Sequence, residues 1–409
     1  MKRRNFLSLL GVLGVGGLSA FGFQKLQKSK YWPNDNQFFN PCLDSKLPES
    51  LEKHEVILSA LEGIDSTHMW DGHVHLIGLG DTDSGIFVNP NYQDVFELKK
   101  YIQFRFYLNA SCVEPGISVD EAFVNRLKTL KWGRGSRVIL LAFDYSYDEQ
   151  GERLLDQTAF HTPNSYAAQI HKESPQHFEW LASIHPYRKD SLEALQQAVF
   201  DGALGVKWLP QAMNINPDSA LCDPFYEAMV HWNIPLLCHC GDEEAVDGAN
   251  IEAYAYGNPL LVRRALDHGV KVIIAHCASL GKNNFELFTQ LMEEPRYEGL
   301  LFGDISAMSQ VNRDDMLALK TVISRKEWHS RLLYGSDYPL PGIIPLISLK
   351  DLQAQELLTA EQVKVLAQLR QHNPLLFNFV LNRHLKVENQ KLSPIVFHTR
   401  SFWTLGTRL

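Results

Sequence analysis

The chain has 409 residues, of which 45% are hydrophobic and 21% are charged, and its formal net charge at pH 7 is -8. This composition excludes a disordered chain, and the length fits one barrel domain with elaborated loops or two ordinary domains. No Lys/Arg block follows the first four residues, which argues against nucleic acid as a partner.

Residues 1–30 have the pattern of an export signal. Basic residues at 2–4 precede an apolar, glycine-containing stretch at 6–23, and polar residues follow. The string RRNFL at 3–7 resembles a twin-arginine export signal, which implies a folded protein delivered to the periplasm. The apolar stretch is also long enough to remain as an anchor in the inner membrane, facing the periplasm. We expect residues 31–65 to form a linker and a short helix.

Eight short aliphatic or β-branched segments alternate with stretches of helical periodicity between residues 66 and 386. Near-continuous apolar strands that alternate with helices indicate a parallel sheet covered on both faces. Eight such units in about 310 residues favour a closed (β/α)8 TIM barrel over an open sheet. The expected strands are 69–75, 137–143, 180–185, 203–208, 234–239, 270–276, 299–305 and 331–336.

Long insertions are expected after strands 1 and 2. The first runs from residue 76 to about 136 and contains a predicted helix at 93–108, and the second runs from 144 to about 178. Long loops after barrel strands usually form the mouth of an active site. The aromatic tail at 387–409 is expected to pack on the barrel.

The first expected strand contains the sequence DGHVH at residues 71–75. Side chains alternate along a strand, so Asp71, His73 and His75 share a face. Two imidazoles near the end of one strand can chelate a single metal ion. Two histidines on a strand are a weak signal by themselves, because chance produces the same pattern.

Three further metal-capable residues each end an apolar run. His239, His276 and Asp337 end the fifth, sixth and eighth expected strands. Barrel active sites lie at the C-terminal ends of the strands. Any one of these histidines is explained equally well as a hydrogen-bonded core residue or a helix cap, but the whole set predicts a metal site.

This set resembles the amidohydrolase superfamily, and most closely its family-2 branch, which includes aminocarboxymuconate-semialdehyde decarboxylase-like enzymes. The resemblance spans residues 66–382 and includes GSDYP at 335–339 and HNPLLF at 372–377. It implies roles for the candidate residues: His73, His75 and His239 as ligands, Asp337 as ligand and proton shuttle, and His276 as ligand of a second metal or as the group that polarises a substrate carbonyl. The chemistry of these residue types agrees, because a divalent ion held by them would lower the pKa of a bound water and make hydroxide available at neutral pH.

The number of metal ions depends on Lys207, which lies at the end of the fourth expected strand. Binuclear members of the superfamily bridge two metals with a carbamylated lysine at this place, so the resemblance makes Lys207 a candidate bridge. The alternative is a lysine that binds a substrate carboxylate or pairs with an acid. We expect one or two zinc ions, because the site is histidine-rich, with manganese or iron as alternatives.

Five other residues are candidates for supporting roles. Arg188 is expected either to clamp a substrate carboxylate or to form an ion pair that holds a loop. Trp208 and Tyr338 are expected to bind substrate at the mouth. Asp304 either orients a ligand histidine or caps a helix, and Asp71 lies buried beneath the metal without binding it.

The remaining polar candidates have structural explanations. Alternation places Cys238 and Cys240 toward the helices if His239 faces inward, and Cys277 follows the same logic. A solvated rim is the preferred interpretation of Glu243 and Glu244. The six cysteines show neither a disulfide framework nor paired CxxC spacing.

The sequence therefore predicts a metal-dependent hydrolase that cleaves an amide, ester, lactone or similar bond of a small molecule. The alternative within enzymes is non-oxidative decarboxylation or hydration of an unsaturated or aromatic acid. The alternative outside enzymes is an exported barrel that binds a ligand without turnover. No phosphate-binding glycine loop and no GxSxG sequence are present. The sequence also allows a homodimer, and it does not determine the oligomeric state.

Overall fold

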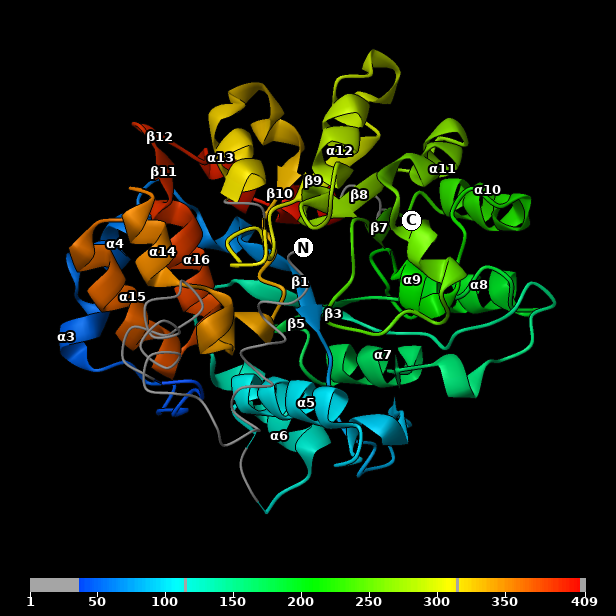
Figure 1. Cartoon of the computed structure of the whole chain (residues 1–409), viewed down its shortest axis with the longest axis horizontal. Helices are drawn as coiled ribbons and strands as arrows, with labels where there is room; N and C mark the ends of the chain where they lie inside the picture. Colours follow the sequence, from blue (N-terminus) through cyan, green and yellow to red (C-terminus); the bar gives the residue numbers. More distant parts are fainter. Residues whose placement is uncertain (1–36, 114–115, 314–315, 405–409) are drawn as a thin grey trace, which may run out of the picture.

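Eight short parallel strands form the centre of the structure, and each overlaps a segment expected from the sequence (Figure 1). The structure is a computed structural model that describes residues 37–113, 116–313 and 316–404, so the expected export signal lies outside the described residues. The strands are β1 (Trp70–His75), β3 (Arg137–Leu141), β5 (Phe178–Leu181), β6 (Val206–Trp208), β7 (Leu236–His239), β8 (Val272–Ala275), β9 (Leu301–Asp304) and β10 (Leu332–Leu333).

The strands pair in the order β1-β3-β5 and β6-β7-β8-β9-β10. The regular ladder is interrupted at two seams, where single parallel bridges join Ala182 to Val206 and Val74 to Tyr338. At the first seam the Lys207 N–H donates to the Ala182 carbonyl at 2.7 Å. The sequential order and the common direction of the strands are those of a (β/α)8 barrel, as predicted.

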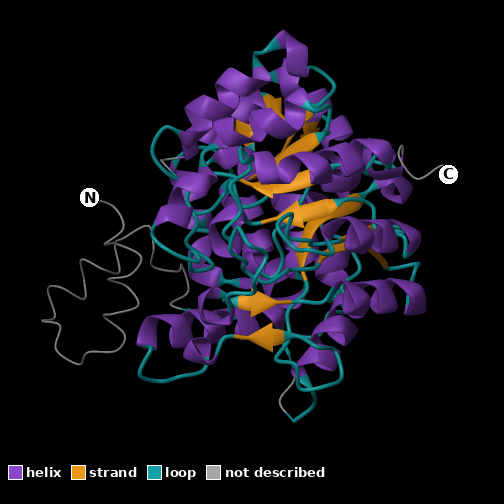
Figure 2. Cartoon of the chain, turned by 90° about the vertical axis from the view of Figure 1, so that its right-hand side faces the viewer, coloured by secondary structure: helices purple, strands orange, loops and turns teal. Residues whose placement is uncertain are grey.

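Helices surround the strands (Figure 2). A capping box formed by Thr359 and Gln362 begins α15, and the Asn373 side chain caps α16, in which Pro374 is the first residue. Within the described ranges, no helix combines the length and apolar character needed to cross a membrane. The helices are α3 (Glu49–Glu52), α4 (Glu55–Leu61), α5 (Leu98–Ser111), α6 (Val119–Thr129), α7 (Asn164–Glu173), α8 (Ser191–Phe200), α9 (Pro210–Met213), α10 (Asp223–His231), α11 (Arg263–Asp267), α12 (Asn284–Met292), α13 (Leu317–Ser324), α14 (Leu349–Ala354), α15 (Ala360–His372), α16 (Pro374–His384) and α17 (Arg400–Thr404).

The insertions after the first two barrel strands contain α5, α6 and α7, and α5 begins five residues later than predicted. An antiparallel pair that the sequence did not predict, β2 (Phe87–Val88) and β4 (Phe160–His161), joins the two insertions. A disulfide between Cys42 and Cys112 ties the N-terminal segment to the end of α5. The sequence prediction of no disulfide framework therefore missed one bond across 70 residues of chain.

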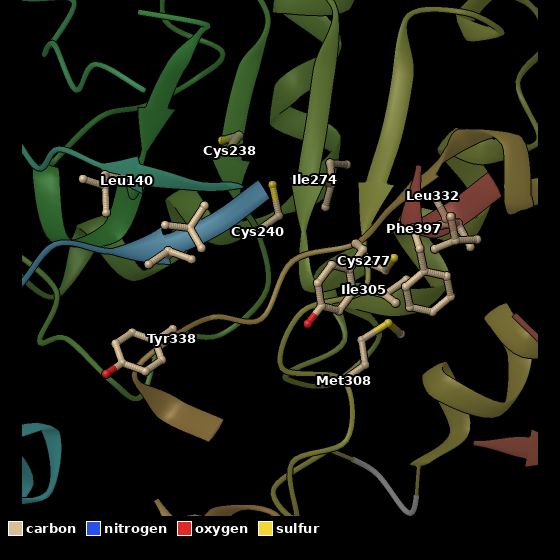
Figure 3. Close-up of a cluster of buried hydrophobic side chains, with 14 of the residues drawn as sticks. Leu140, Cys238, Cys240, Ile274, Cys277, Ile305, Met308, Leu332, Tyr338 and Phe397 are labelled. Atoms are coloured by element: carbon tan, nitrogen blue, oxygen red, sulfur yellow. The ribbon is translucent and has the colours of Figure 1, made fainter. Parts of the chain in front are cut away.

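Buried side chains form an outer and an inner layer around the strands. Cys238, Cys240 and Cys277 belong to the outer cluster, together with Leu140 and Ile274 (Figure 3). The inner cluster contains alternate strand residues and one residue from the C-terminal helix α17: Trp70, Ile139, Leu141, Leu181, Leu204, Leu237, Ile273, Ala275, Leu333 and Trp403. The alternation that places Leu237 in the inner layer turns His239 toward the barrel axis.

A short antiparallel pair and a one-turn helix complete the C-terminal region. The pair is β11 (Lys386–Val387) with β12 (Gln390–Lys391). After it, the Tyr334 N–H donates to the Val396 carbonyl at 2.8 Å, and the Trp70 N–H donates to Thr399 Oγ1 at 3.1 Å. These contacts attach the segment that follows β12 to the two barrel strands nearest the second seam.

Candidate metal centre

Two histidines and one aspartate converge at the C-terminal end of the barrel. The Asp337 Oδ1 atom lies 3.1 Å from His75 Nε2 and 3.5 Å from His73 Nε2. These three residues offer donor atoms that all lie within 4.8 Å of one another. The Asp337 N–H also donates to the His73 carbonyl at 2.9 Å, which fixes the turn after β10 against β1. Two imidazoles and a carboxylate at this spacing suit a divalent cation.

Asp304, at the end of β9, holds the ligand candidate His73 from behind. Its Oδ2 atom lies 2.8 Å from His73 Nδ1, and its Oδ1 atom accepts the N–H groups of His276 at 2.9 Å and Ser306 at 3.0 Å. A hydrogen bond from Nδ1 to a carboxylate leaves the Nε2 lone pair free for a metal. This contact places Asp304 where it could orient a ligand histidine, while its bond to the Ser306 N–H also supports the turn that follows β9.

His276 lies beside His73 in a strained turn. The two rings stack with centroids 5.0 Å apart, and His276 Nδ1 lies 2.7 Å from Ser306 Oγ. His276, Cys277 and Ala278 all have positive φ values, of 57°, 48° and 51°. Consecutive left-handed residues without glycine are costly, and such strain concentrates at functional sites. His73, His276 and Asp304 form a second candidate group of donors, but hydrogen bonds already occupy much of it.

His239 lies next to this cluster, outside both candidate donor groups. Its ring centroid is 5.2 Å from that of His276. Its Nε2 atom is 3.3 Å from both the Asp242 carbonyl and the Glu243 carboxylate. The structure thus brings His73, His75 and Asp337 closest together and places the expected third imidazole one ring further away.

Lys207 and Asp71 lie buried against the same histidine. Lys207 Nζ is 3.4 Å from His73 Nε2, and burial lowers the pKa of its ammonium. Asp71 Oδ1 accepts the N–H groups of His73 at 3.1 Å and Ser336 at 2.8 Å. Burial raises the pKa of Asp71 to about 7. Asp71 therefore supports the strand end locally through these two backbone hydrogen bonds.

Burial sets the ionisation of the cluster. It lowers the pKa of His73 and His276 well below the ordinary range and that of His239 to about 3. Burial alone would raise the pKa of Asp337, but the His75 hydrogen bond and the positive charge of Lys207 help to outweigh it and lower that pKa. Neutral imidazoles beside an ionised carboxylate are the protonation states that metal binding requires.

The two aromatic residues expected at the mouth belong to the core. Trp208 is fully buried against Phe225 and Tyr226, and its indole N–H donates to the Ile184 carbonyl at 2.8 Å. Tyr338 is also fully buried, and its hydroxyl donates to the Ser111 carbonyl at 3.3 Å. Each follows an inward residue, Lys207 or Asp337, so alternation turns it toward the helices. The predicted substrate-binding roles of Trp208 and Tyr338 are therefore wrong.

Arg188 forms the loop ion pair that was the alternative to a substrate clamp. Its Nη1 atom donates to Asp144 at 2.8 Å, and its Nε and Nη2 atoms donate to the two oxygens of Asp190 at 2.9 and 2.7 Å. A guanidinium engaged by two carboxylates has little capacity left for a substrate anion. The structure therefore corrects the expected substrate contact of Arg188.

Two charged residues of the site escaped the sequence prediction. Glu243, expected on a solvated rim, has a side chain only 7% exposed that faces His239, and burial raises its pKa. Arg313, in the loop after β9, is 5% exposed. The spacing of Glu243 four residues after His239 was an available signal, whereas the position of Arg313 in an irregular loop gave none. Glu244 is exposed, as expected.

A search of curated proteins finds no match. Among solved structures, an uncharacterised TIM-barrel protein from Bordetella bronchiseptica is 16% identical, with 74% of this chain and 99% of that chain covered and a TM-score of 0.45. A putative 2-pyrone-4,6-dicarboxylic acid hydrolase from Pseudomonas putida is 15% identical, with 76% and 97% covered and a TM-score of 0.43. A manganese-bound mutant of a 5-carboxyvanillate decarboxylase from Novosphingobium aromaticivorans is 12% identical, with 75% and 94% covered and a TM-score of 0.41.

A family model described as amidohydrolase matches residues 144–375. The match includes His239, His276 and Asp337 but begins after β1, so the structure alone places His73 and His75 beside Asp337. Because the matched segment is more than half of the chain, this protein belongs to the amidohydrolase family.

Proposed function

We propose that this protein is a metal-dependent hydrolase that cleaves an amide, ester, lactone or related bond of a small molecule. The observation that carries the proposal is the convergence of His73, His75 and Asp337, with donor atoms within 4.8 Å of one another at the C-terminal end of the barrel. Family membership supports the same chemistry.

The donor set fits a divalent cation, and zinc is the proposed ion. His73 and His75 would supply Nε2 atoms and Asp337 a carboxylate oxygen, with His276 and His239 as candidates for further coordination. When bound, such a cation supplies Lewis acidity and lowers the pKa of a coordinating water toward 7. If Lys207 carries a carbamate, its position 3.4 Å from His73 Nε2 suits a bridge to a second ion. An increase in the mass of Lys207 by one carbon dioxide unit would identify that form.

Each residue of the site would have a separate role in the proposed hydrolysis. Asp337, which is buried and ionised, would accept a proton from the attacking water as the water oxygen bonds to the substrate carbonyl carbon. It would then return that proton to the leaving nitrogen or oxygen as the scissile bond breaks. His276 would stabilise the negative charge that develops on the carbonyl oxygen. Asp304 would keep His73 in the required tautomer throughout.

A non-oxidative decarboxylase or hydratase of an unsaturated or aromatic acid is the alternative. The buried ammonium of Lys207 favours it, because a cation inside a site attracts a carboxylate. The two reactions are distinguished with a panel of lactones, esters, amides and aromatic acids in ¹⁸O-labelled water. Hydrolysis places one labelled oxygen in a carboxyl group of the product and hydration places it in a hydroxyl group, whereas decarboxylation releases carbon dioxide and leaves the remaining product without the label.

Metal dependence is tested by removing the metal with a chelator and restoring it. We expect turnover to disappear in the stripped protein and to return with zinc, manganese or iron. If stripped and reloaded samples bind a ligand equally and neither turns over any compound, the protein is a ligand-binding barrel and the hydrolase proposal fails.

We also propose export by the twin-arginine route to the periplasm, with the signal either cleaved or kept as an inner-membrane anchor. The disulfide between Cys42 and Cys112 supports an oxidising compartment. Replacing Arg3 and Arg4 together by Lys should retain the protein in the cytoplasm, as measured by cell fractionation. Unchanged recovery from the periplasm would contradict this route.

A further inference from the structure

Arg313 is a buried cation with almost no partner. Its side chain is 5% exposed, and its Nε atom has no hydrogen bond within the described part of the chain. The one hydrogen bond of its guanidinium there is a long one, 3.5 Å from Nη2 to Gln310 Oε1. A buried guanidinium that lacks a carboxylate partner is expensive, because desolvation is not offset. Arg188, by contrast, binds two carboxylates.

The loop that carries Arg313 lies between two other loops of the barrel mouth. It follows β9, and its Val311 N–H donates to the Leu346 carbonyl at 3.0 Å, in the connection after β10. The Asn312 Nδ2 atom donates to Glu244 Oε2 at 3.1 Å, in the connection after β7. Asp337 and Glu243 lie in these same connections, after β10 and β7, so Arg313 is held at the end of the barrel that carries the candidate metal centre.

The electrostatic interactions agree with this position. Burial and then the charges of Lys207 and Arg313 lower the pKa of His239. The carboxylates that act on Arg313 include Asp337 and Glu243, but neither forms an ion pair with it. The charge of Arg313 therefore reaches the site while its hydrogen-bond donors remain available.

We propose that Arg313 binds a carboxylate group of the substrate, with Gln310 beside it, and so restricts the enzyme to small carboxylic acids. This inference rests on the proposed function, because it names the substrate class of the same site. A carboxylate would accept two parallel hydrogen bonds from the guanidinium and would supply the partner that the buried cation lacks. The substrate would then be held by a group remote from the bond that breaks.

Calorimetric binding to the metal-loaded protein tests the proposal without requiring turnover. The probes are acetate, benzoate and isophthalate, each compared with its neutral amide. The variants are Arg313→Gln and Arg313→Lys, and the matched control is Arg153→Gln, which alters an exposed arginine in the connection after β3. Metal content and thermal unfolding are measured for every variant, so that a folding defect is recognised.

We expect the wild type to bind at least one acid more tightly than its amide. Arg313→Gln should weaken the binding of that acid by about tenfold or more and leave the amide unchanged, with partial recovery in Arg313→Lys. The Arg153→Gln control should behave as wild type. Wild-type acid affinity in a folded, metal-loaded Arg313→Gln protein would overturn the proposal, as would a wild type that shows no preference for acids. If Arg313→Gln loses acid binding as expected but the metal-loaded wild type turns over no compound, the carboxylate site stands and only the hydrolase proposal fails.

Discussion

Replacing Asp304 by Asn changes a single hydrogen-bonding group behind the metal centre. The Oδ1 atom, which accepts from His276 N and Ser306 N, is preserved as the amide oxygen. The group facing His73 Nδ1 at 2.8 Å becomes an amide nitrogen, which is a donor. His73 must then accept on Nδ1 and carry its proton on Nε2, the atom that faces Asp337. The variant therefore holds His73 in the tautomer that cannot bind a metal.

We expect the affinity for a divalent metal to fall by about 10- to 100-fold, which corresponds to about 1.4–2.7 kcal/mol. Metal-free protein is titrated at neutral pH against a chromophoric chelator of known affinity. Asp190→Asn is the control, because that carboxylate is 63% exposed and pairs with Arg188 on the loop. Denaturant unfolding of the metal-free proteins shows whether the fold is intact. If Asp304→Asn binds metal as tightly as the wild type, the hydrogen bond to Asp304 does not set the tautomer of His73.

Three further perturbations test the rest of the site. Asp337→Asn should keep most of the metal and abolish turnover, because an amide accepts no proton. Metal analysis and activity assays check this, and turnover that survives in the variant would remove the proton-shuttle role. His73→Ala should lose the metal, so full metal content by elemental analysis would remove His73 from the ligand set. Lowering the pH from about 6.5 toward 3 should destabilise the metal-free protein, because burial holds the pKa of His239 at about 3 and the unfolded state then binds more protons. His239→Gln should reduce that dependence in urea unfolding but not abolish it, because burial also lowers the pKa of His73 and His276. Asp71, whose pKa burial raises to about 7, acts in the opposite direction.

The sequence predicted the elements that obey one simple rule. Each barrel strand is an apolar run, and the residue that follows or ends the run marks the face where chemistry occurs, so His239, His276 and Asp337 were recognisable. Alternation along the first strand added His73 and His75. Trp208 and Tyr338 were misplaced because the same alternation was not applied to the residue that follows an inward side chain. Both lie in the outer cluster.

The features that the sequence did not predict depend on how individual loops fold and on contacts between distant parts of the chain. Glu243 follows a turn beside a second acid and has the composition of a rim, yet the backbone N–H of Val246 holds its carboxylate at 3.1 Å beneath the surface. Arg313 is placed by hydrogen bonds to two other connections, which no local pattern contains. The bond between Cys42 and Cys112 likewise depends on tertiary proximity, since 70 residues separate the two cysteines.

The helix α17 closes the end of the barrel opposite the metal centre. A Cβ atom added to Gly72 would lie 3.3 Å from the Trp403 indole, and the Trp70 N–H is bound by Thr399. Both contacts are to β1, the strand that carries His73 and His75. Truncation before Thr399, or a tag that displaces Trp403, would therefore leave the start of β1 unsupported. We expect this loss of support to lower metal loading at the other end of the same strand. We therefore expect His73 and His75, the candidate ligand pair, to be held in place only once the chain extends past Trp403, so metal stoichiometry should be measured on recombinant protein with an intact C-terminal segment.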